Sequence, residues 1–141
     1  MTSVPRSVGT MISDAAAELY VNDPSARWLG IELVAADLDG ATVRMTISSE
    51  MCNGFDIVHG GMVFLLADSA MAFDSNSQTD PAVATTAEID WLAPARAGQV
   101  LVARATSRWR SKRAALWDIE ITADDQPVAL FRGRTRTIPG G

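Results

Sequence analysis

The stretch GGMVFLLADSAMAFDSN, residues 60–76, carries the strongest structural signal in this chain. It is rich in Met, Leu, Ala and Phe and is apolar almost all the way round. A helix that lacks a polar stripe is covered by other parts of the protein on all sides. At 1.5 Å per residue it would be roughly 25 Å long. The sequence therefore predicts one long central helix.

Strand-like segments lie on both sides of this helix. Before it, residues 30–38 and 41–48 read as two strands joined by Asp39-Gly40, a pair typical of a tight hairpin. After it, alternating apolar and polar residues predict further strands over 83–91, 99–109, 114–123 and 127–137. The sum is an α+β chain in which a long antiparallel sheet wraps around the central helix.

The rest of the chain adds one element and no second domain. Residues 9–21 predict a short amphipathic helix, which Pro24 is expected to end. No linker or repeat divides the sequence, so we expect a single domain over residues 1–141. On the last strand one face is expected to carry Val128, Leu130, Arg132, Arg134 and Arg136.

Composition narrows the classes of partner. The 141 residues carry a net charge of −5, which argues against nucleic acid because duplex binding needs clustered positive charge. Cys52 is the only cysteine and His59 the only histidine, so we expect neither an internal disulfide nor a metal site. The N-terminal residues lack the apolar segment of a secretion signal, and no stretch approaches the roughly 20 apolar residues that span a bilayer. We therefore expect a cytoplasmic protein without a membrane partner.

Asp68 stands out because its carboxyl group interrupts the apolar run FLLADSAMAF. Burial of an unpaired carboxylate would cost several kcal/mol, so the position needs a reason. One interpretation is structural, with Asp68 as a satisfied buried acid that caps a neighbouring loop. The other is that Asp68 carries chemistry. The residues alone leave both open.

His59-Gly60-Gly61 directly precedes the helix. Glycines let a ligand approach the backbone closely, and free N–H groups at a helix start attract negative charge, as an oxyanion hole requires. The same glycines also suit a tight turn into the helix. Asn53-Gly54 is, by itself, an ordinary turn pair.

Ser69 is a poor candidate for a nucleophile. The single His59 is nearly three helical turns away, so a serine–histidine pair would need a second subunit. Ser69 is better explained as bonding its own helix backbone or orienting Asp68. We therefore reject a serine hydrolase.

Several motifs follow one another in a recognisable order: MCNG at 51–54, HGG at 59–61, LADS at 66–69, TAEIDWLAP at 86–94, WDIEI at 117–121 and ALFRG at 129–133. In this order the chain resembles the phenylacetate-degradation (PaaI-type) acyl-CoA thioesterases of the hotdog superfamily. The spacing of His59, nine residues before Asp68, is the most specific part of the pattern. The resemblance implies a hotdog fold and thioester hydrolysis without a metal or redox cofactor.

The resemblance also implies roles for individual positions. Asp68 matches the helix carboxylate that acts as general base on water or as nucleophile on the thioester carbonyl. Gly60 matches the residue whose backbone N–H stabilises the oxyanion. His59 and Asn53 match polar residues beside the thioester, and Ser69 matches a position where a small hydroxyl residue is common. The implied substrate is a phenylacetyl- or hydroxyphenylacetyl-CoA, with a medium-chain acyl-CoA as the alternative.

A basic turn at residues 110–113 is a candidate for substrate binding. We expect Arg110, Lys112 and Arg113 to meet the phosphates of coenzyme A, and Gly61 to contact the substrate as well. The alternative is a solvated sheet face on which basic residues pair across strands with acidic ones. Core or interface positions, one of which could line the acyl pocket, are expected for Trp28, Trp91, Trp109 and Trp117.

The spacing of two residues predicts an active site shared between chains. Gly60 and Asp68 are eight residues apart on one helix, a rise of about 12 Å. A reacting carbonyl must lie about 3 Å from both the attacking group and the oxyanion donor, so one chain cannot supply both. We therefore expect a homo-oligomer in which Asp68 of one chain faces Gly60 of another across a two-fold axis. The resemblance implies a tetramer of two such dimers.

Two other functions stay open. A hydratase acting on acyl-CoA would need a His base opposite an acid, whereas His59 lies at the helix entrance, and it would release no thiol. A non-catalytic acyl-CoA-binding protein would bind without turnover. A gene-regulatory version of it would normally carry a basic DNA-binding segment, which this chain lacks.

Overall fold

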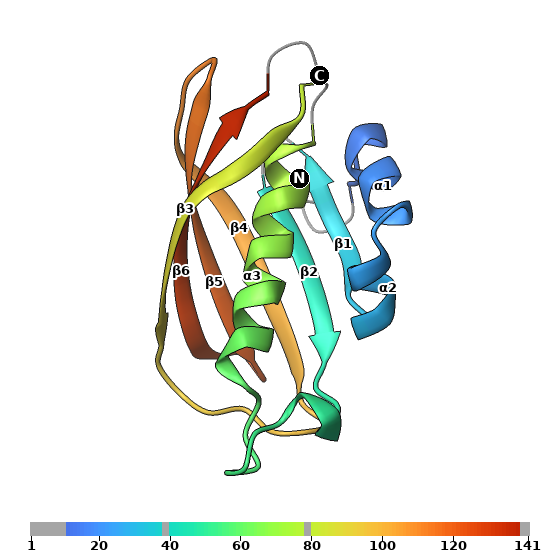
Figure 1. The fold of residues 1–141 in the computed structure, drawn as a ribbon, viewed down its shortest axis with the longest axis vertical. Helices are drawn as coiled ribbons and strands as arrows, with labels where there is room; N and C mark the ends of the chain where they lie inside the picture. Colours follow the sequence, from blue (N-terminus) through green and yellow to red (C-terminus); the bar gives the residue numbers. More distant parts are fainter. Residues whose placement is uncertain (1–10, 38–39, 78–79, 139–141) are drawn as a thin grey trace, which may run out of the picture.

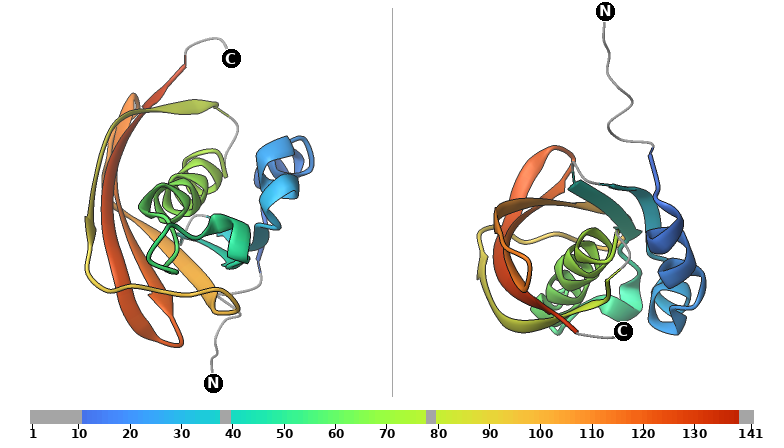
Figure 2. Two further views of the ribbon diagram at one scale, coloured as in Figure 1. Left: turned by 60° about the horizontal axis from the view of Figure 1, so that its bottom comes forward. Right: turned by 90° about the horizontal axis from the view of Figure 1, so that it is seen from above.

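Helix α3, Gly60–Ser75, lies against a six-stranded antiparallel sheet in this computed structural model, which describes residues 11–37, 40–77 and 80–138 (Figure 1). The strands are β1 Glu32–Asp37, β2 Gly40–Thr46, β3 Ala82–Trp91, β4 Val100–Arg110, β5 Ala114–Ala123 and β6 Gln126–Thr137. Their order across the sheet is β1-β2-β4-β5-β6-β3, and every neighbouring pair is antiparallel. Seen from above, the sheet curves around α3 (Figure 2). The predicted α+β class and hotdog arrangement are confirmed.

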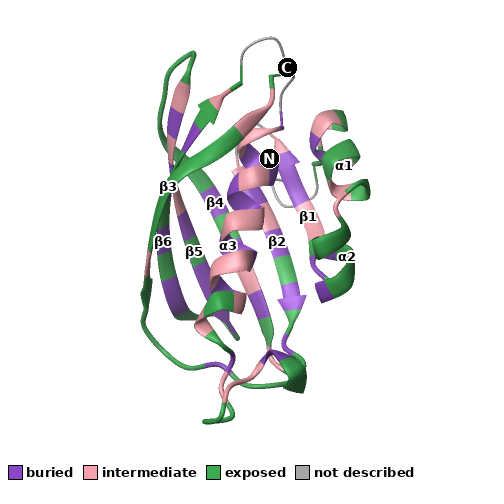
Figure 3. Cartoon of the chain, in the orientation of Figure 1, coloured by how far each residue is buried: buried purple, intermediate pink, exposed green. Residues whose placement is uncertain are grey.

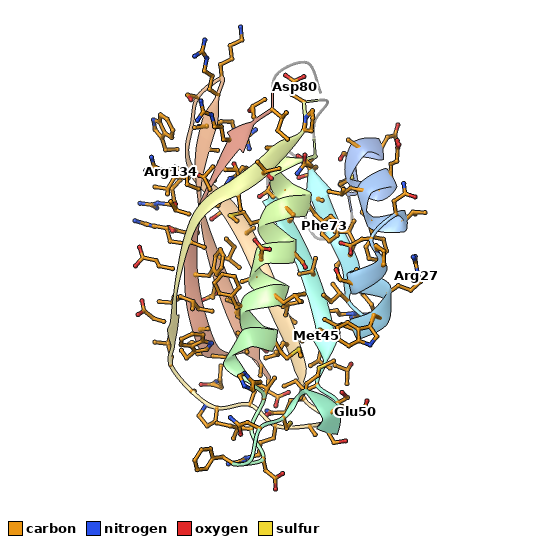
Figure 4. The ribbon with its side chains drawn as sticks, in the orientation of Figure 1. Arg27, Met45, Glu50, Phe73, Asp80 and Arg134 are labelled. Carbon is orange, nitrogen blue, oxygen red and sulfur yellow. The ribbon has the colours of Figure 1, made fainter. Side chains whose placement is uncertain are left out.

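The core lies between α3 and the concave face of the sheet. Phe73 of α3 and Met45 of β2 are fully buried there, whereas Arg134 of β6 lies on the outer face of the sheet (Figure 4). The side of α3 that faces the sheet carries Val63, Leu66, Ala67, Ala70, Met71, Phe73 and Asp74. Burial of this apolar side is what holds the helix in place.

The opposite side of α3 is only partly covered. Gly61 is exposed, and Leu65, Asp68 and Ala72 are half-buried (Figure 3). The sequence pattern predicts a helix covered on all sides, and a single chain covers one side only. An apolar helix face left open is a surface on which another chain can pack.

Strand β3 is an edge strand that hydrogen-bonds to β6 alone. Nearly all its residues are exposed, on both faces (Figure 3). The alternation in residues 83–91 predicts one inward face; on it Ile89 packs against the core, whereas Val83 is 50% exposed. Long exposed edges of this kind are natural sites for pairing with another chain.

The N-terminal segment differs from its prediction. Helix α1, Asp14–Val21, begins after Ser13, whose side chain accepts a hydrogen bond from the Ala16 N–H at 3.2 Å. Pro24 does not simply end this helix; it begins a second one, α2, Pro24–Leu29. Proline suits the first position of a helix because its missing N–H would have no partner there. Both helices lie beside β1 (Figure 1).

Two details of the strands were not predicted. Gly40, with φ of 146°, opens β2 so close to β4 that a Cβ would lie 2.6 Å from the Ala105 carbonyl oxygen; Asp39 lies outside the described residues. On β6, the pairing with β5 shifts at Ile121/Thr122. The irregularity buries Val128, so the prediction that it shares a face with the arginines was wrong. Leu130, at 48% exposed, does lie on the same face as Arg132, Arg134 and Arg136.

Candidate active site

The start of α3 is formed by His59, Gly60 and Gly61. His59 caps the helix: its Nδ1 accepts a hydrogen bond from the Gly61 N–H at 3.3 Å, and its own backbone N–H donates to the Met51 carbonyl at 2.8 Å. Among the residues that the structure describes, no oxygen accepts from the Gly60 N–H. A free N–H at the positive end of a helix is suited to hold a developing negative charge.

The cap also sets the state of the His59 ring. Because Nδ1 accepts a hydrogen bond, the neutral imidazole carries its proton on Nε2. The side chain is exposed, so the Nε2–H is available as a donor beside the Gly60 N–H. His59 therefore orders the helix start with one nitrogen and offers the other to a ligand.

Asn53 holds the loop that precedes the helix. Its side-chain Oδ1 accepts from the Phe55 N–H at 2.9 Å, and its backbone N–H donates to the Ile57 carbonyl at 2.9 Å. Asp56 takes a left-handed conformation, with φ of 60°, within this turn. The carbonyl end of the Asn53 side chain is thus used by the turn, which leaves the Nδ2 amide as a hydrogen-bond donor.

Trp91, the last residue of β3, packs directly on the first residue of α3. Its indole N–H donates to the Gly60 carbonyl at 3.2 Å. A Cβ at Gly60 would lie 2.9 Å from Trp91 Cε2, a distance that real side chains do not adopt. A side chain at residue 60 would require the Trp91 ring to shift, so this contact favours glycine there. The sequence offered no such signal, because a tryptophan in an alternating strand is as typical of the hydrophobic core as of a functional site.

These residues surround one open cavity of about 550 Å³. Its polar groups are those of Asn53, His59 and the backbone of Gly60 and Gly61. Its apolar wall includes Ile57, Val58, Trp91, Leu92, Pro94 and Val128. An apolar cavity with a few converging donors is the usual form of a small-molecule site. The structure therefore brings together four of the site residues expected from the sequence.

Asp68 does not line this cavity in the single chain. It lies about two helical turns further along α3, on the open side, and burial raises the pKa of its carboxyl group above the ordinary 3.8. Ser69 is the next residue, turned by about 100° around the helix, and is also half-buried. The predicted distance between Gly60 and Asp68 holds, since both lie on the one unbroken helix.

The basic turn lies at the other end of α3. The Arg110 guanidinium sits over the Trp117 ring, 5.1 Å from its centroid. Arg110 and Lys112 line a separate cavity of about 260 Å³ with Ser75, the last residue of α3. Ser75 is roughly 22 Å along the helix from its start. Arg110, Lys112 and Arg113 are therefore not brought to the Gly60 cavity within one chain.

Other arginines pair across strands on the outer face of the sheet. The Nε of Arg132 lies 2.7 Å from an Asp118 oxygen, and the Nε of Arg108 lies 3.3 Å from the second one. The hydrogen bond from Arg132 and its charge lower the pKa of the Asp118 carboxyl group. For these two arginines the structure supports cross-strand pairing.

No group of three or more His, Cys, Asp or Glu residues is placed to hold a metal ion in the described part of the chain. Within the same residues, no helix has the length and apolar character needed to cross a membrane.

Comparison with known proteins gives a consistent picture. A family model described as the thioesterase superfamily matches residues 55–130. The chain is 44% identical to the acyl-coenzyme A thioesterase PaaI of Escherichia coli over 86% of this chain and 88% of that protein. The solved structure of the Escherichia coli PaaI protein from the phenylacetic acid degradation operon superposes with a TM-score of 0.87, covering 89% of this chain and 92% of that one.

Two further solved structures are similar. A mutant of the phenylacetic acid degradation protein PaaI from Thermus thermophilus is 32% identical, with a TM-score of 0.79 over 82% of this chain and all of that one (100%). A hypothetical thioesterase from Streptococcus pneumoniae, solved with coenzyme A, is 18% identical, with a TM-score of 0.72 over 76% of this chain and 87% of that one. At that identity the likeness concerns the fold alone.

Proposed function

The chain belongs to the thioesterase superfamily and, within it, to the PaaI-type acyl-CoA thioesterases, and we propose that it hydrolyses an aromatic acyl-CoA to the free acid and coenzyme A. The observation that carries the proposal is the unused Gly60 N–H, which opens into an apolar cavity beside the donors of His59 and Asn53. The aromatic preference is supported by the PaaI relatives, whose names refer to phenylacetic acid degradation. A medium-chain acyl-CoA is the alternative substrate.

The proposed site is completed by a second copy of the chain. Gly60 and Asp68 lie about 12 Å apart on one rigid helix, so a single thioester carbonyl cannot contact both within one chain. Two antiparallel α3 helices that pack through their open sides would place Asp68 of each chain opposite Gly60 of the other. The half-open face of α3 and the exposed edge strand β3 supply the surfaces for this dimer. We propose that two such dimers form a tetramer.

The proposed mechanism begins with the thioester carbonyl oxygen accepting the Gly60 N–H. Asp68 of the second chain takes a proton from water, and the water oxygen attacks the carbonyl carbon. The tetrahedral intermediate collapses, its C–S bond breaks, and the proton on Asp68 passes to the coenzyme A thiolate. The Nε2–H of His59 and the Nδ2 of Asn53 orient the carbonyl or the water. Direct attack by Asp68, with a transient anhydride that water then hydrolyses, is the second route.

The reaction balances with water alone and uses no metal or redox cofactor.

The antiparallel arrangement of the two α3 helices also offers a role for the basic turn. It places the C-terminal end of one α3 beyond the Gly60 end of the other, so the turn with Arg110, Lys112 and Arg113 from one chain would lie on the side of its neighbour's cavity. Guanidinium and ammonium groups there suit the phosphates of coenzyme A. The cytoplasm is the location that fits such a substrate.

The direct test measures thiol release from a panel of aryl and alkyl acyl-CoAs. We expect release that depends on the protein and is fastest with phenylacetyl-type substrates. Addition of water across a double bond without thiol release would indicate a hydratase. Saturable binding of acyl-CoA with no turnover would indicate a binding protein, and either result would contradict the proposal.

Replacing Asn53 by Asp separates the two roles of this side chain. The carboxylate still accepts the Phe55 N–H, so the turn and the thermal midpoint are expected to change little. The Nδ2 donor is lost, and we expect kcat for thiol release to fall by about tenfold or more. Asn53→Ala, which loses the acceptor too, is the matched control and is expected to lower the midpoint as well. An Asn53→Asp enzyme with native kcat would make Asn53 a turn residue only.

A further inference from the structure

We propose that Trp91 is a positioning residue for the reaction, because it fixes the first turn of α3 and thereby the direction of the Gly60 N–H. The inference rests on the proposed function and adds to it a residue on a different element, strand β3. Its basis is the contact of Trp91 with Gly60, which joins residues 31 positions apart in the sequence.

The hydrogen bond from Trp91 restrains the Gly60 carbonyl, which already has a hydrogen-bond donor within the helix. The Gly60 carbonyl belongs to the first turn of the helix, where it already serves as a helical acceptor and keeps a second lone pair. The indole N–H takes that lone pair at 3.2 Å. Since the bond satisfies no orphaned acceptor, its main effect is to hold the Gly60 carbonyl in place.

The first turn is held from two sides, and neither contact uses the catalytic donor. On one side the His59 ring accepts the Gly61 N–H; on the other, the Trp91 indole donates to the Gly60 carbonyl. Both contacts hold the peptide unit that joins Gly60 to Gly61. The Gly60 N–H belongs to the neighbouring peptide unit and has no acceptor among the described residues. An oxyanion donor is most effective when its direction is fixed before the charge develops. The two contacts provide that restraint.

The indole ring also excludes a side chain at residue 60. Three ring atoms, Cε2, Nε1 and Cζ2, lie 2.9, 3.0 and 3.1 Å from the place of a Gly60 Cβ. Trp91 is 56% exposed in the single chain, so the core of that chain does not need it. Its close contact with the Gly60 backbone at the cavity wall is what supports a role at the site.

The first experiment compares Trp91→Phe and Trp91→Ala with the native enzyme. Trp91→Phe keeps an aromatic ring against Gly60 but loses the N–H donor. We expect its kcat to fall by about five- to tenfold with KM within about twofold of native, and Trp91→Ala to fall further. The control is Trp28→Phe on α2, a 76% exposed tryptophan outside the cavity, whose kinetics are expected to match the native enzyme.

The second experiment is a double-mutant cycle with Gly60. In the native background, Gly60→Ala forces a Cβ against the indole, and we expect at least about a hundredfold loss of kcat and a lower thermal midpoint. In the Trp91→Ala background the space is free, so the same Ala is expected to cost much less in both measurements. Contact between the two residues therefore predicts strong non-additivity.

The outcomes separate this inference from the proposed function. If the native chain releases no thiol from any acyl-CoA, the proposed function falls and the inference falls with it. If the native chain is active and Trp91→Phe retains native kcat, only the inference is overturned. An equal effect of Gly60→Ala on kcat in both backgrounds would also overturn it, because Trp91 would then not be what constrains the helix start.

Discussion

Asp68→Asn is expected to lower kcat for thiol release by about a thousandfold, the scale of a lost general base or nucleophile. The amide cannot take a proton from water, and it is similar in size to the carboxyl group it replaces. Burial raises the pKa of the Asp68 carboxyl group, so its charge is a cost to the folded chain. The variant should therefore assemble as the native protein does and unfold at the same or a higher temperature. Size-exclusion chromatography and thermal unfolding provide those controls.

The native enzyme gives a pH readout of the same residue. Asp68 must be ionised to act, so kcat is expected to fall as the pH falls, with a midpoint above the ordinary carboxyl pKa of 3.8. The residual kcat of Asp68→Asn should not show this fall at low pH. A native-like rate in Asp68→Asn, with the oligomer intact, would leave Asp68 as a structural acid and contradict the mechanism.

Mixed oligomers test whether the site is shared. Asp68→Asn chains and Gly60→Ala chains, each inactive alone, are co-expressed with different tags and the hybrids are purified. In a hybrid dimer one of the two sites combines the intact Gly60 of one chain with the intact Asp68 of the other, so the purified hybrid dimer should have about half of native activity. If both groups acted within one chain, no hybrid would contain an intact site. If Gly60→Ala does not assemble, Asn53→Ala can replace it, because Asn53 and Gly60 of one chain line the same cavity.

The central helix and the core of the site were predictable because they are local in sequence. His59, Gly60 and Gly61 cap and open α3 in the order in which they are written, and a run of apolar residues at 60–76 needs little context to be recognised as a buried helix. The rise per residue then fixes the distance from Gly60 to Asp68 without any tertiary information.

What sequence reasoning missed depends on contacts between distant segments. Trp91 meets Gly60 only because the sheet order brings the end of β3 to the start of α3. Val128 turns inward because the pairing of β5 with β6 slips by one position. These two contacts have no signature in a single stretch of residues. The second helix is different: the first helix ends at Val21, before Pro24, and the Asp23 cap that starts α2 is a local signal that was overlooked.

Asp74 shows the same limit within α3. An apolar pattern without a polar stripe does not indicate which side of the helix faces the sheet. Asp68 and Asp74 are six residues, or about 120°, apart around the axis, and the structure places Asp68 on the open side and Asp74 against the sheet. Asp74 is 2% exposed, and neither of its carboxyl oxygens has a hydrogen-bond partner among the residues that the structure describes. Of the two acids, the one with no expected chemistry is the more buried.

We expect Asp74 to make the native protein less stable as the pH rises from about 4 to 8. Burial raises the pKa of its carboxyl group to about 7, an effect that Arg110 opposes and Asp37 reinforces. In the unfolded chain the same group ionises near 3.8. Between these values the folded state keeps a proton that the unfolded state has lost, so the free energy of unfolding falls with rising pH and levels off above pH 7. The difference of about three pKa units corresponds to about 4 kcal/mol.

Asp74→Asn removes this titration because the amide stays neutral at every pH in the range. At pH 4 its stability should be close to native, since both side chains are then uncharged, and at pH 8 it should be more stable by several kcal/mol, with a clearly higher thermal midpoint. The exposed Asp80→Asn is the matched control and is expected to follow the native pH profile. Urea unfolding of the three proteins at a series of pH values makes the measurement. A native profile that stays flat from pH 4 to 8 would mean that the ionised Asp74 has a partner, and Arg110, whose charge already opposes the rise in the pKa of this carboxyl group, is the candidate.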